Sequence, residues 1–331
     1  MRLASLQRRL LGCLALAVAT VSPVAHAGEK FVFLTDWFAQ AEHGGFYQAQ
    51  ALGLYKQAGL DLTIRMGGPQ VNLVQLLAAG QADCIMGFDV QTMKAWEQGV
   101  QAVTVAAFAQ KDPLVLIAHP DVQRLEDLKD RTLLIGQAGQ VTYWPWLKAR
   151  YGFNDKQVRP YTFNIQPFLA DKRIAQQGYL TSEPYSIEKA SGIKPKVFLM
   201  ADQGWPPYAG SVVCLKRSVE QRPQAITAFL KASAEGWKRY LQGDPAPANA
   251  LIKRDNPNMT DDVIAQSIAL LKAHGIVLGG DAAVHGIGTI TDARMKRTFD
   301  MLVQHKLIDP SKVDWRQTYT TRLIQPVQVK P

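Results

Sequence analysis

The sequence predicts an α/β protein with two lobes, each built on a parallel-core sheet flanked by helices, and two crossovers that form a hinge. Strand-forming runs alternate with helical segments, as in parallel α/β sheets, and this alternation restarts near residue 114. The last third of the chain is mostly helical. We therefore assign residues 28–108 and 209–331 to lobe I, and residues 109–208 to lobe II with the crossovers.

Residues 1–27 are predicted to be a cleavable signal peptide. Three arginines precede the apolar run 10–21, and Ala25-His26-Ala27 ends in a small-x-small pattern, which is typical of secretory leaders. The run is too short to cross a bilayer, which needs about 20 apolar residues. Cys13 could mark a lipoprotein site, but almost no apolar run precedes it. We therefore expect cleavage after Ala27 and a periplasmic location.

The first α/β block is read from periodicity and turn residues. Apolar residues at helical spacing predict a helix over 45–57, and Gly59 would end it with a left-handed cap. The remaining predicted elements are strands 31–34, 60–66, 84–88 and 103–108, and helices 71–79 and 90–98.

The second block repeats the pattern, and the tail returns to the first block. Its predicted strands are 114–118, 132–136, 158–163, 177–181 and 196–200, and its helices are 125–128, 143–151, 167–172 and 185–191. The tail has a strand at 211–215 and helices at 223–241, 247–252, 260–274 and 291–305, too few strands for a third sheet. The chain then crosses between lobes near 109–113 and 201–208, which predicts a hinged, closing cleft.

Charge and cysteine content narrow the class of partner. The net charge of +9 comes from scattered Lys and Arg, without the basic stripe of a nucleic-acid binder, so we expect no nucleic acid as a partner. We also expect the protein to be a monomer. Cys84 and Cys214 lie in apolar runs. Export would allow them to pair, but buried free thiols are the expectation. No Cys/His spacing resembles a metal site, and no cofactor is expected.

The candidate site is predicted from the strand ends, because ligands of open α/β sheets gather there. Aromatic side chains dominate these positions and are suited to stacking on a planar ring. The predicted ligand-binding residues are Trp37, Phe38, His43, Tyr47, Phe88, Asp89, Tyr143, Trp144, Glu183, Tyr185, Trp205 and Tyr208.

Three of these residues also have a purely structural interpretation. His43 could hydrogen-bond a heterocycle or cap the helix that it opens. Asp89 and Glu183 could accept from ring amino groups, or cap the helices that follow them. No nucleophile with a positioned base stands out, so we expect no catalytic residues and no enzyme.

A family resemblance rests on the segments 35–47, 54–62, 76–83, 125–130 and 178–185. These resemble the ABC-transporter solute-binding proteins related to thiamine-pyrimidine synthase, a group with formylaminopyrimidine-, sulfonate- and nitrate-binding members. The resemblance implies the two-lobed periplasmic binding protein fold of type II. It also implies a small planar heteroaromatic solute, such as a thiamine pyrimidine precursor, and an ABC permease with its ATPase as partners.

The chain departs from the synthases of that family at two places. The synthases hold pyridoxal phosphate with a lysine after the third strand, where this sequence has Asp89. They also carry a cysteine-rich run near the return into the first lobe, where this sequence has Cys214 alone. The resemblance therefore implies a binding protein. The alternatives are a synthase-like enzyme that uses pyridoxal phosphate, or a receptor for sulfonate, nitrate or riboflavin.

Overall fold

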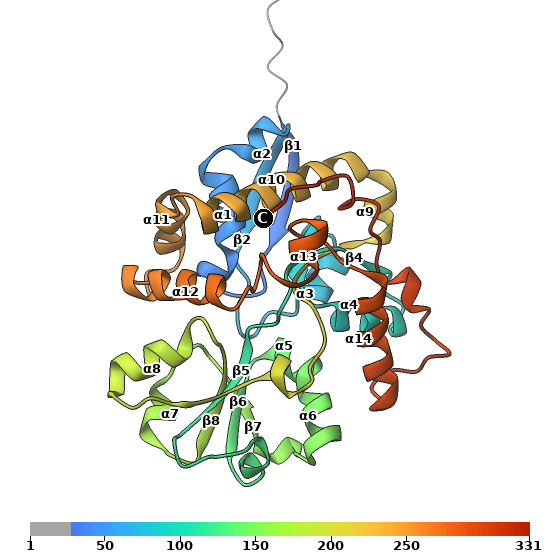
Figure 1. Cartoon of the computed structure of the whole chain (residues 1–331). Helices are drawn as coiled ribbons and strands as arrows, with labels where there is room; N and C mark the ends of the chain where they lie inside the picture. Colours follow the sequence, from blue (N-terminus) through green and yellow to red (C-terminus); the bar gives the residue numbers. More distant parts are fainter. Residues whose placement is uncertain (1–27) are drawn as a thin grey trace, which may run out of the picture.

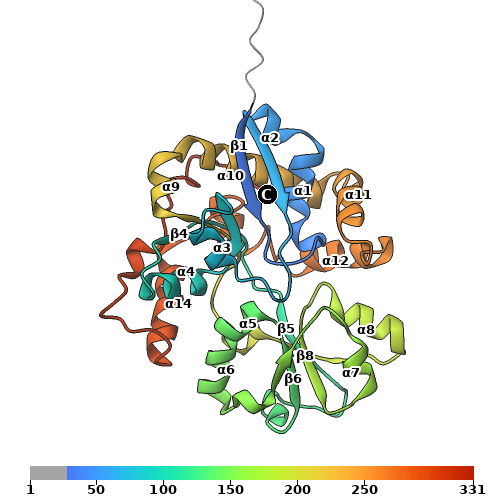
Figure 2. The ribbon, with the colours of Figure 1, turned by 180° about the vertical axis from the view of Figure 1, so that it is seen from behind.

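The computed structural model describes residues 28–331, so the predicted signal peptide lies outside the described residues. The chain forms two lobes, each built on a five-stranded sheet, and in both views lobe II lies below lobe I (Figures 1 and 2). Lobe I contains β1 (Glu29–Leu34), β2 (Leu60–Arg65), β3 (Cys84–Gly87), β4 (Ala102–Ala109) and β10 (Ala209–Leu215). Lobe II contains β5 (Leu114–Ala118), β6 (Thr132–Ile135), β7 (Val158–Pro160), β8 (Ile174–Tyr179) and β9 (Lys196–Leu199).

The two sheets share one topology, which follows from the crossovers. The strand orders are β2-β1-β3-β10-β4 and β7-β6-β8-β5-β9. In each sheet the fourth strand, β10 or β5, is antiparallel to both of its neighbours. These are the first strands after each crossover, so they start at the cleft where the other strands end. The prediction of two parallel-core sheets and two crossovers is confirmed, and the antiparallel strand is an addition to it.

The helices of lobe I cover both faces of its sheet. They are α1 (Gly44–Ala51), α2 (Leu54–Gln57), α3 (Leu73–Ala78), α4 (Asp89–Glu97), α9 (Lys216–Gln221), α10 (Pro223–Gln242), α11 (Ala246–Asp255), α12 (Asp261–Ala273), α13 (Gly280–His285) and α14 (Asp292–Gln304). The tail packs on the first block as predicted, since α10 and α11 lie against α1. The single helix predicted over 45–57 is wrong. Gly53 has a φ of 67°, a left-handed conformation that breaks the segment into α1 and α2.

Lobe II has fewer helices: α5 (Gln137–Val141), α6 (Tyr143–Tyr151), α7 (Gln166–Ala170) and α8 (Glu183–Ser191). Single 3-10 turns occur in both lobes: η1 (Ala41–His43), η2 (Leu125–Leu128), η3 (Asp155–Gln157), η4 (Met200–Gln203) and η5 (Trp315–Gln317). Among the described residues, no helix has both the length and the hydropathy that crossing a bilayer requires.

Cys84 and Cys214 form a disulfide, so the expectation of two free thiols is wrong. The two residues face each other directly in the antiparallel pairing of β3 with β10. Both are completely buried. The apolar flanks that suggested free thiols reflect this central position in the lobe I sheet. The bond ties the returning strand to the first block.

Candidate ligand site between the lobes

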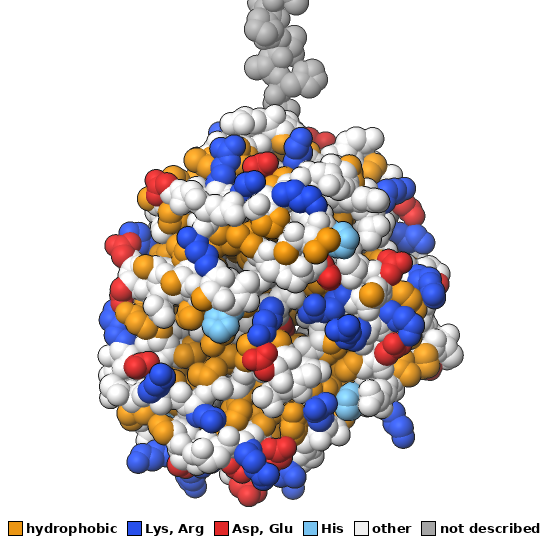
Figure 3. Space-filling model, viewed as in Figure 1, with side chains coloured by type: hydrophobic (Ala, Val, Ile, Leu, Met, Phe, Trp, Pro, Cys, Tyr) orange, Lys and Arg blue, Asp and Glu red, His pale blue; other side chains and the backbone are white. Residues whose placement is uncertain are grey.

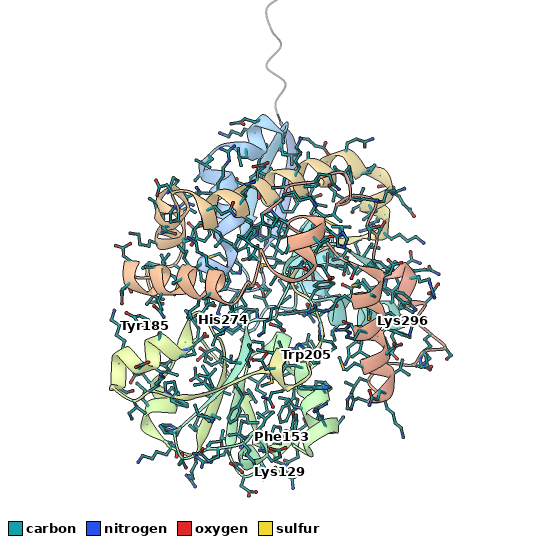
Figure 4. All side chains as sticks on the ribbon, in the orientation of Figure 1. Lys129, Phe153, Tyr185, Trp205, His274 and Lys296 are labelled. Atoms are coloured by element: carbon teal, nitrogen blue, oxygen red, sulfur yellow. A yellow bond between two sulfur atoms is a disulfide. The ribbon has the colours of Figure 1, made fainter. Side chains whose placement is uncertain are left out.

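A cavity lies between the lobes where the strand ends of the two sheets face each other. Its free volume in this structure is about 40 Å³, below the usual range for small-molecule sites, so the lining residues rather than the size mark it as the candidate site. Trp205, on the second crossover, lines the cavity and lies in the upper part of lobe II, next to lobe I (Figure 4). The lining residues are Asp36, Trp37, Gln40, Phe88, Asp112, Leu114, Ala138, Gly139, Thr142, Tyr143, Gln177, Gly178, Tyr179, Glu183 and Trp205.

Trp37 brings a large aromatic face from lobe I against lobe II. It follows β1, and its ring stacks on Tyr161 of lobe II with centroids 6.0 Å apart and planes 12° apart. Gly136 leaves room for this approach, because a Cβ there would lie 3.4 Å from the indole. Phe163, in lobe II, meets the same indole edge-on at 6.1 Å. The two lobes are therefore in direct contact around the cavity.

Glu183 opens α8 and is 6% exposed. Its carboxylate accepts from Tyr161 Oη and from Tyr179 N, both at 2.9 Å. Gly178 must be glycine for this arrangement, since a Cβ there would lie 3.0 Å from Glu183 Cβ and 2.6 Å from Ile117 Cδ1. Burial raises the pKa of Glu183 to about 7, although these hydrogen bonds act in the opposite direction. Glu183 is thus a buried acid without a cationic partner among the described residues.

Asp112 occupies the first crossover and is almost completely buried. It accepts from Leu114 N and from Trp205 Nε1, both at 3.0 Å. Because Trp205 belongs to the second crossover, this bond connects the two hinge segments. Burial raises the pKa of Asp112 to about 7. Like Glu183, this carboxyl group has only neutral donors.

The lobe I wall adds further acceptors. Asp36 pairs with His43 Nε2 at 3.0 Å, and Tyr179 Oη of lobe II donates to it at 3.4 Å. Gln40 is 3% exposed, and its Oε1 has no hydrogen-bond partner among the described residues. On the lobe II side, Gln177 Oε1 accepts from Gly136 N and Tyr143 Oη at 2.7 and 2.9 Å. The polar wall is therefore rich in oxygen acceptors, and one of them, Gln40 Oε1, has no donor among the described residues.

Five of the twelve predicted ligand-binding residues line the cavity: Trp37, Phe88, Tyr143, Glu183 and Trp205. They come from both lobes and from the second crossover. Their contact with a solute stays a prediction.

The other seven predicted residues do not line the cavity: Phe38, His43, Tyr47, Asp89, Trp144, Tyr185 and Tyr208. Phe38 packs on Phe163 at 5.8 Å beside the cavity. His43 is completely buried behind Asp36. It precedes α1, but its side chain caps no backbone donor.

Hydrogen bonds to the protein explain the positions of most of the rest. Asp89 accepts from Thr298 Oγ1 at 2.9 Å inside lobe I, and Tyr208 Oη donates to Asp281. Trp144 Nε1 donates to Asp155 at 2.8 Å within lobe II. Tyr47 is buried in lobe I. Tyr185 lies at the outer side of the molecule (Figure 4) and donates to Asp262 of α12.

Several lining residues were not predicted, for two reasons. Tyr179 and Gln177 lie at the carboxyl end of β8, but the predicted strand began three residues late and placed Tyr179 in its middle. Asp112 precedes a strand, so a search after strand ends cannot find it. The useful signal is its position in the crossover, next to Pro113. Within residues 28–331, no group of three or more metal-ligating side chains is arranged to hold an ion.

Comparison with known proteins relates the chain to thiamine-pyrimidine proteins. The family model described as NMT1/THI5 like matches residues 40–248, more than half of the chain. A Haemophilus influenzae protein named for thiamine biosynthesis is 23% identical over 242 residues, covering 70% of this chain and 75% of that protein. A Saccharomyces cerevisiae 4-amino-5-hydroxymethyl-2-methylpyrimidine phosphate synthase is 21% identical over 251 residues, covering 67% and 74%.

Solved structures with the same fold include binding proteins of import systems. A Bordetella bronchiseptica protein superimposes with a TM-score of 0.72 at 16% identity, covering 91% of this chain and 97% of that one. The Escherichia coli aliphatic sulphonate binding protein SsuA gives 0.61 at 15% identity, covering 88% and 91%. The nitrate-binding protein NrtA of Synechocystis gives 0.63 at 14% identity, covering 91% and 88%. The chain therefore has the periplasmic binding protein fold and belongs to the NMT1/THI5-like family.

Proposed function

We propose that this chain is the periplasmic solute-binding component of an ABC importer, and that it binds a small planar heterocycle such as a thiamine pyrimidine precursor. In this function two lobes close around the solute, and a permease with its ATPase takes it up. The fold is shared with import-system binding proteins, and the family links the chain to pyrimidine chemistry.

The observation that carries the proposal is the composition of the interlobe cavity. Aromatic rings of lobe I, lobe II and the crossover line it together, including Trp37, Tyr143 and Trp205. Their faces suit a flat ring. The carboxylates and the unpartnered Gln40 Oε1 suit the amino groups of a heterocycle.

An anionic solute fits this cavity poorly. Sulfonate and nitrate need cationic side chains or several converging N–H donors. The lining contains no Lys, Arg or His, and it contains three carboxyl groups. The likeness to SsuA and NrtA is therefore a likeness of fold, and we do not extend their solutes to this chain.

A pyridoxal phosphate enzyme also fits poorly. The lining contains no lysine to hold the aldehyde and no cationic side chain for the phosphate. Asp89, at the position of the synthase lysine, is completely buried and bonded to Thr298. We therefore propose a binding protein without catalytic activity. Pyridoxal phosphate absorbance in the purified protein, or turnover of any substrate, would contradict this.

Calorimetric titration of the chain lacking residues 1–27 tests the proposed solute class. We expect 4-amino-5-hydroxymethyl-2-methylpyrimidine to bind, and methanesulfonate and nitrate not to bind. Native mass spectrometry of protein purified from the periplasm should find a co-purified aromatic solute. A bound sulfonate or nitrate, in place of an aromatic solute, would overturn the proposal.

A matched pair of tryptophan variants tests the site itself. Trp37→Ala should weaken binding about tenfold, because it removes an aromatic face of the cavity and the interlobe contact with Tyr161. Trp96→Ala is the control, since Trp96 is also half-buried in lobe I but does not line the cavity. Equal affinities of the two variants would show that the aromatic wall is not the binding surface.

A further inference from the structure

The interlobe cavity has an unusual charge balance. Its lining contains Asp36, Asp112 and Glu183 but no Lys, Arg or His. Glu42 lies behind this wall, 6% exposed, and receives a hydrogen bond from Thr181. Within the described residues, the nearest basic group to this set is His43, which is bonded to Asp36.

The hydrogen bonds of Asp112 and Glu183 leave their charge uncompensated. Their donors are two backbone N–H groups, the Trp205 indole and the Tyr161 hydroxyl. None of these donors carries a charge, and no ion pair of the described chain includes either carboxylate. A buried carboxylate without a cation is costly. A bound proton can neutralise each carboxylate, in agreement with the raised pKa of both groups.

The aromatic walls favour the same sign of charge. Trp37, Phe88, Tyr143, Tyr179 and Trp205 line the same space as the carboxylates. The faces of such rings attract cations through their quadrupoles. Gln40 Oε1, buried and unpartnered, adds one more acceptor to the wall. Carboxylates, ring faces and the amide oxygen all favour a cation with several N–H donors, and all disfavour an anion.

We propose that the solute of this site is a cationic planar ring, a protonated or amidinium-like nitrogen compound whose charged edge is received by Asp112 and Glu183. This rests on the proposed function and narrows its solute class. A neutral aminopyrimidine could satisfy the hydrogen bonds, but both carboxyl groups would then have to stay protonated or remain buried without a counter-charge.

Three probes of nearly the same shape test the charge directly: benzamidine (cationic), benzamide (neutral) and benzoate (anionic). Calorimetric titration or competition with the pyrimidine should show benzamidine binding at least about tenfold more tightly than benzamide, as expected for charge-assisted hydrogen bonds. Benzoate should not bind. Benzamide binding as tightly as benzamidine overturns the proposal.

Carboxylate variants then locate the effect. Glu183→Gln and Asp112→Asn should each reduce the ratio of benzamidine to benzamide affinity toward one. Asp121→Asn is the matched control, because Asp121 is an exposed carboxylate paired with Arg131 and does not line the cavity. An unchanged ratio in both cavity variants overturns the proposal, even if benzamidine binds.

The outcomes separate this inference from the proposed function. If the neutral pyrimidine binds and benzamidine does not, the charge inference fails and the proposed function stands. If neither the pyrimidine nor any of the three benzene derivatives binds, the proposed solute class fails, and the inference fails with it.

Discussion

At the scale of single residues, the site depends on buried acids that would be solvated on an ordinary surface. Glu183 is held by Tyr161 and by the backbone of Tyr179, and Glu42 is a further carboxylate behind them. Burial is the main cause of the raised pKa of Glu183, and the charge of Glu42 acts in the same direction. The folded protein thus keeps a destabilising buried acid at the proposed site, and such groups are common at functional sites.

Glu183→Gln should change how stability depends on pH. The folded pKa of Glu183 is about 7, against an ordinary value of 4.5. Between these values the folded state keeps a proton that the unfolded state has lost, so the unfolding free energy falls as pH rises. Glutamine removes this penalty. Relative to the unmodified chain, the variant should therefore gain thermal stability between about pH 5 and about pH 8.

Thermal unfolding of the ligand-free protein at both pH values measures this effect. Glu188→Gln, on the exposed side of the same helix α8, is the control and should show no pH-dependent gain. An equal difference between Glu183→Gln and the unmodified chain at both pH values would mean that Glu183 is charged in the folded protein at both.

At the scale of elements, the sequence was a good guide wherever local periodicity decides the structure. The strands were found because short β-branched and aromatic runs end in turn residues. The split between α1 and α2 was not predicted, because apolar spacing continues through Gly53 and only its positive φ breaks the helix. The site was partly predicted for a related reason. A residue after a strand is visible in sequence, but the direction of its side chain depends on tertiary partners. Asp89 and Tyr208 turned toward lobe I partners.

The disulfide between β3 and β10 gives a prediction at this scale. It joins residues 130 apart in sequence, so it restricts a long loop in the unfolded chain. Replacing both cysteines with alanine should lower the unfolding free energy by about 2–5 kcal/mol, measured by chemical denaturation. Because the substitution also removes buried volume, the unmodified chain should be unfolded in parallel with a thiol reductant. If reduction leaves its stability unchanged, the bond contributes nothing.

At the scale of the whole molecule, the proposed function requires two lobes that can part and close again. The crossovers at residues 109–113 and 201–208 are joined by the bond from Trp205 to Asp112, and Arg294 of α14 donates to the carbonyls of Gln110 and Pro206. Basic and acidic side chains are interspersed over both lobes on the face shown in Figure 3. We therefore expect specific interlobe contacts, rather than the overall charge, to favour the closed form.

One such contact lies outside the cavity and can be changed without touching the solute. Asp262 of α12 in lobe I accepts from Tyr185 Oη at 2.9 Å and pairs with Lys189 Nζ of α8 in lobe II at 2.6 Å. Asp262→Lys would place two ammonium groups face to face across the lobes. We expect it to favour the open form, with a larger radius of gyration in X-ray scattering of the ligand-free protein.

The same change should weaken solute binding about three- to tenfold, because the apparent dissociation constant rises as the binding-competent population falls. Saturating solute should restore the radius of gyration of the unmodified complex, since the cavity is intact. Asp121→Lys, which breaks the pair with Arg131 inside lobe II, is the control and should alter neither quantity. If Asp262→Lys leaves both affinity and dimensions unchanged, the contact between α8 and α12 has no part in closure. The closed form would then depend on contacts at the cavity itself, from Trp37 on Tyr161 to Thr181 on Glu42.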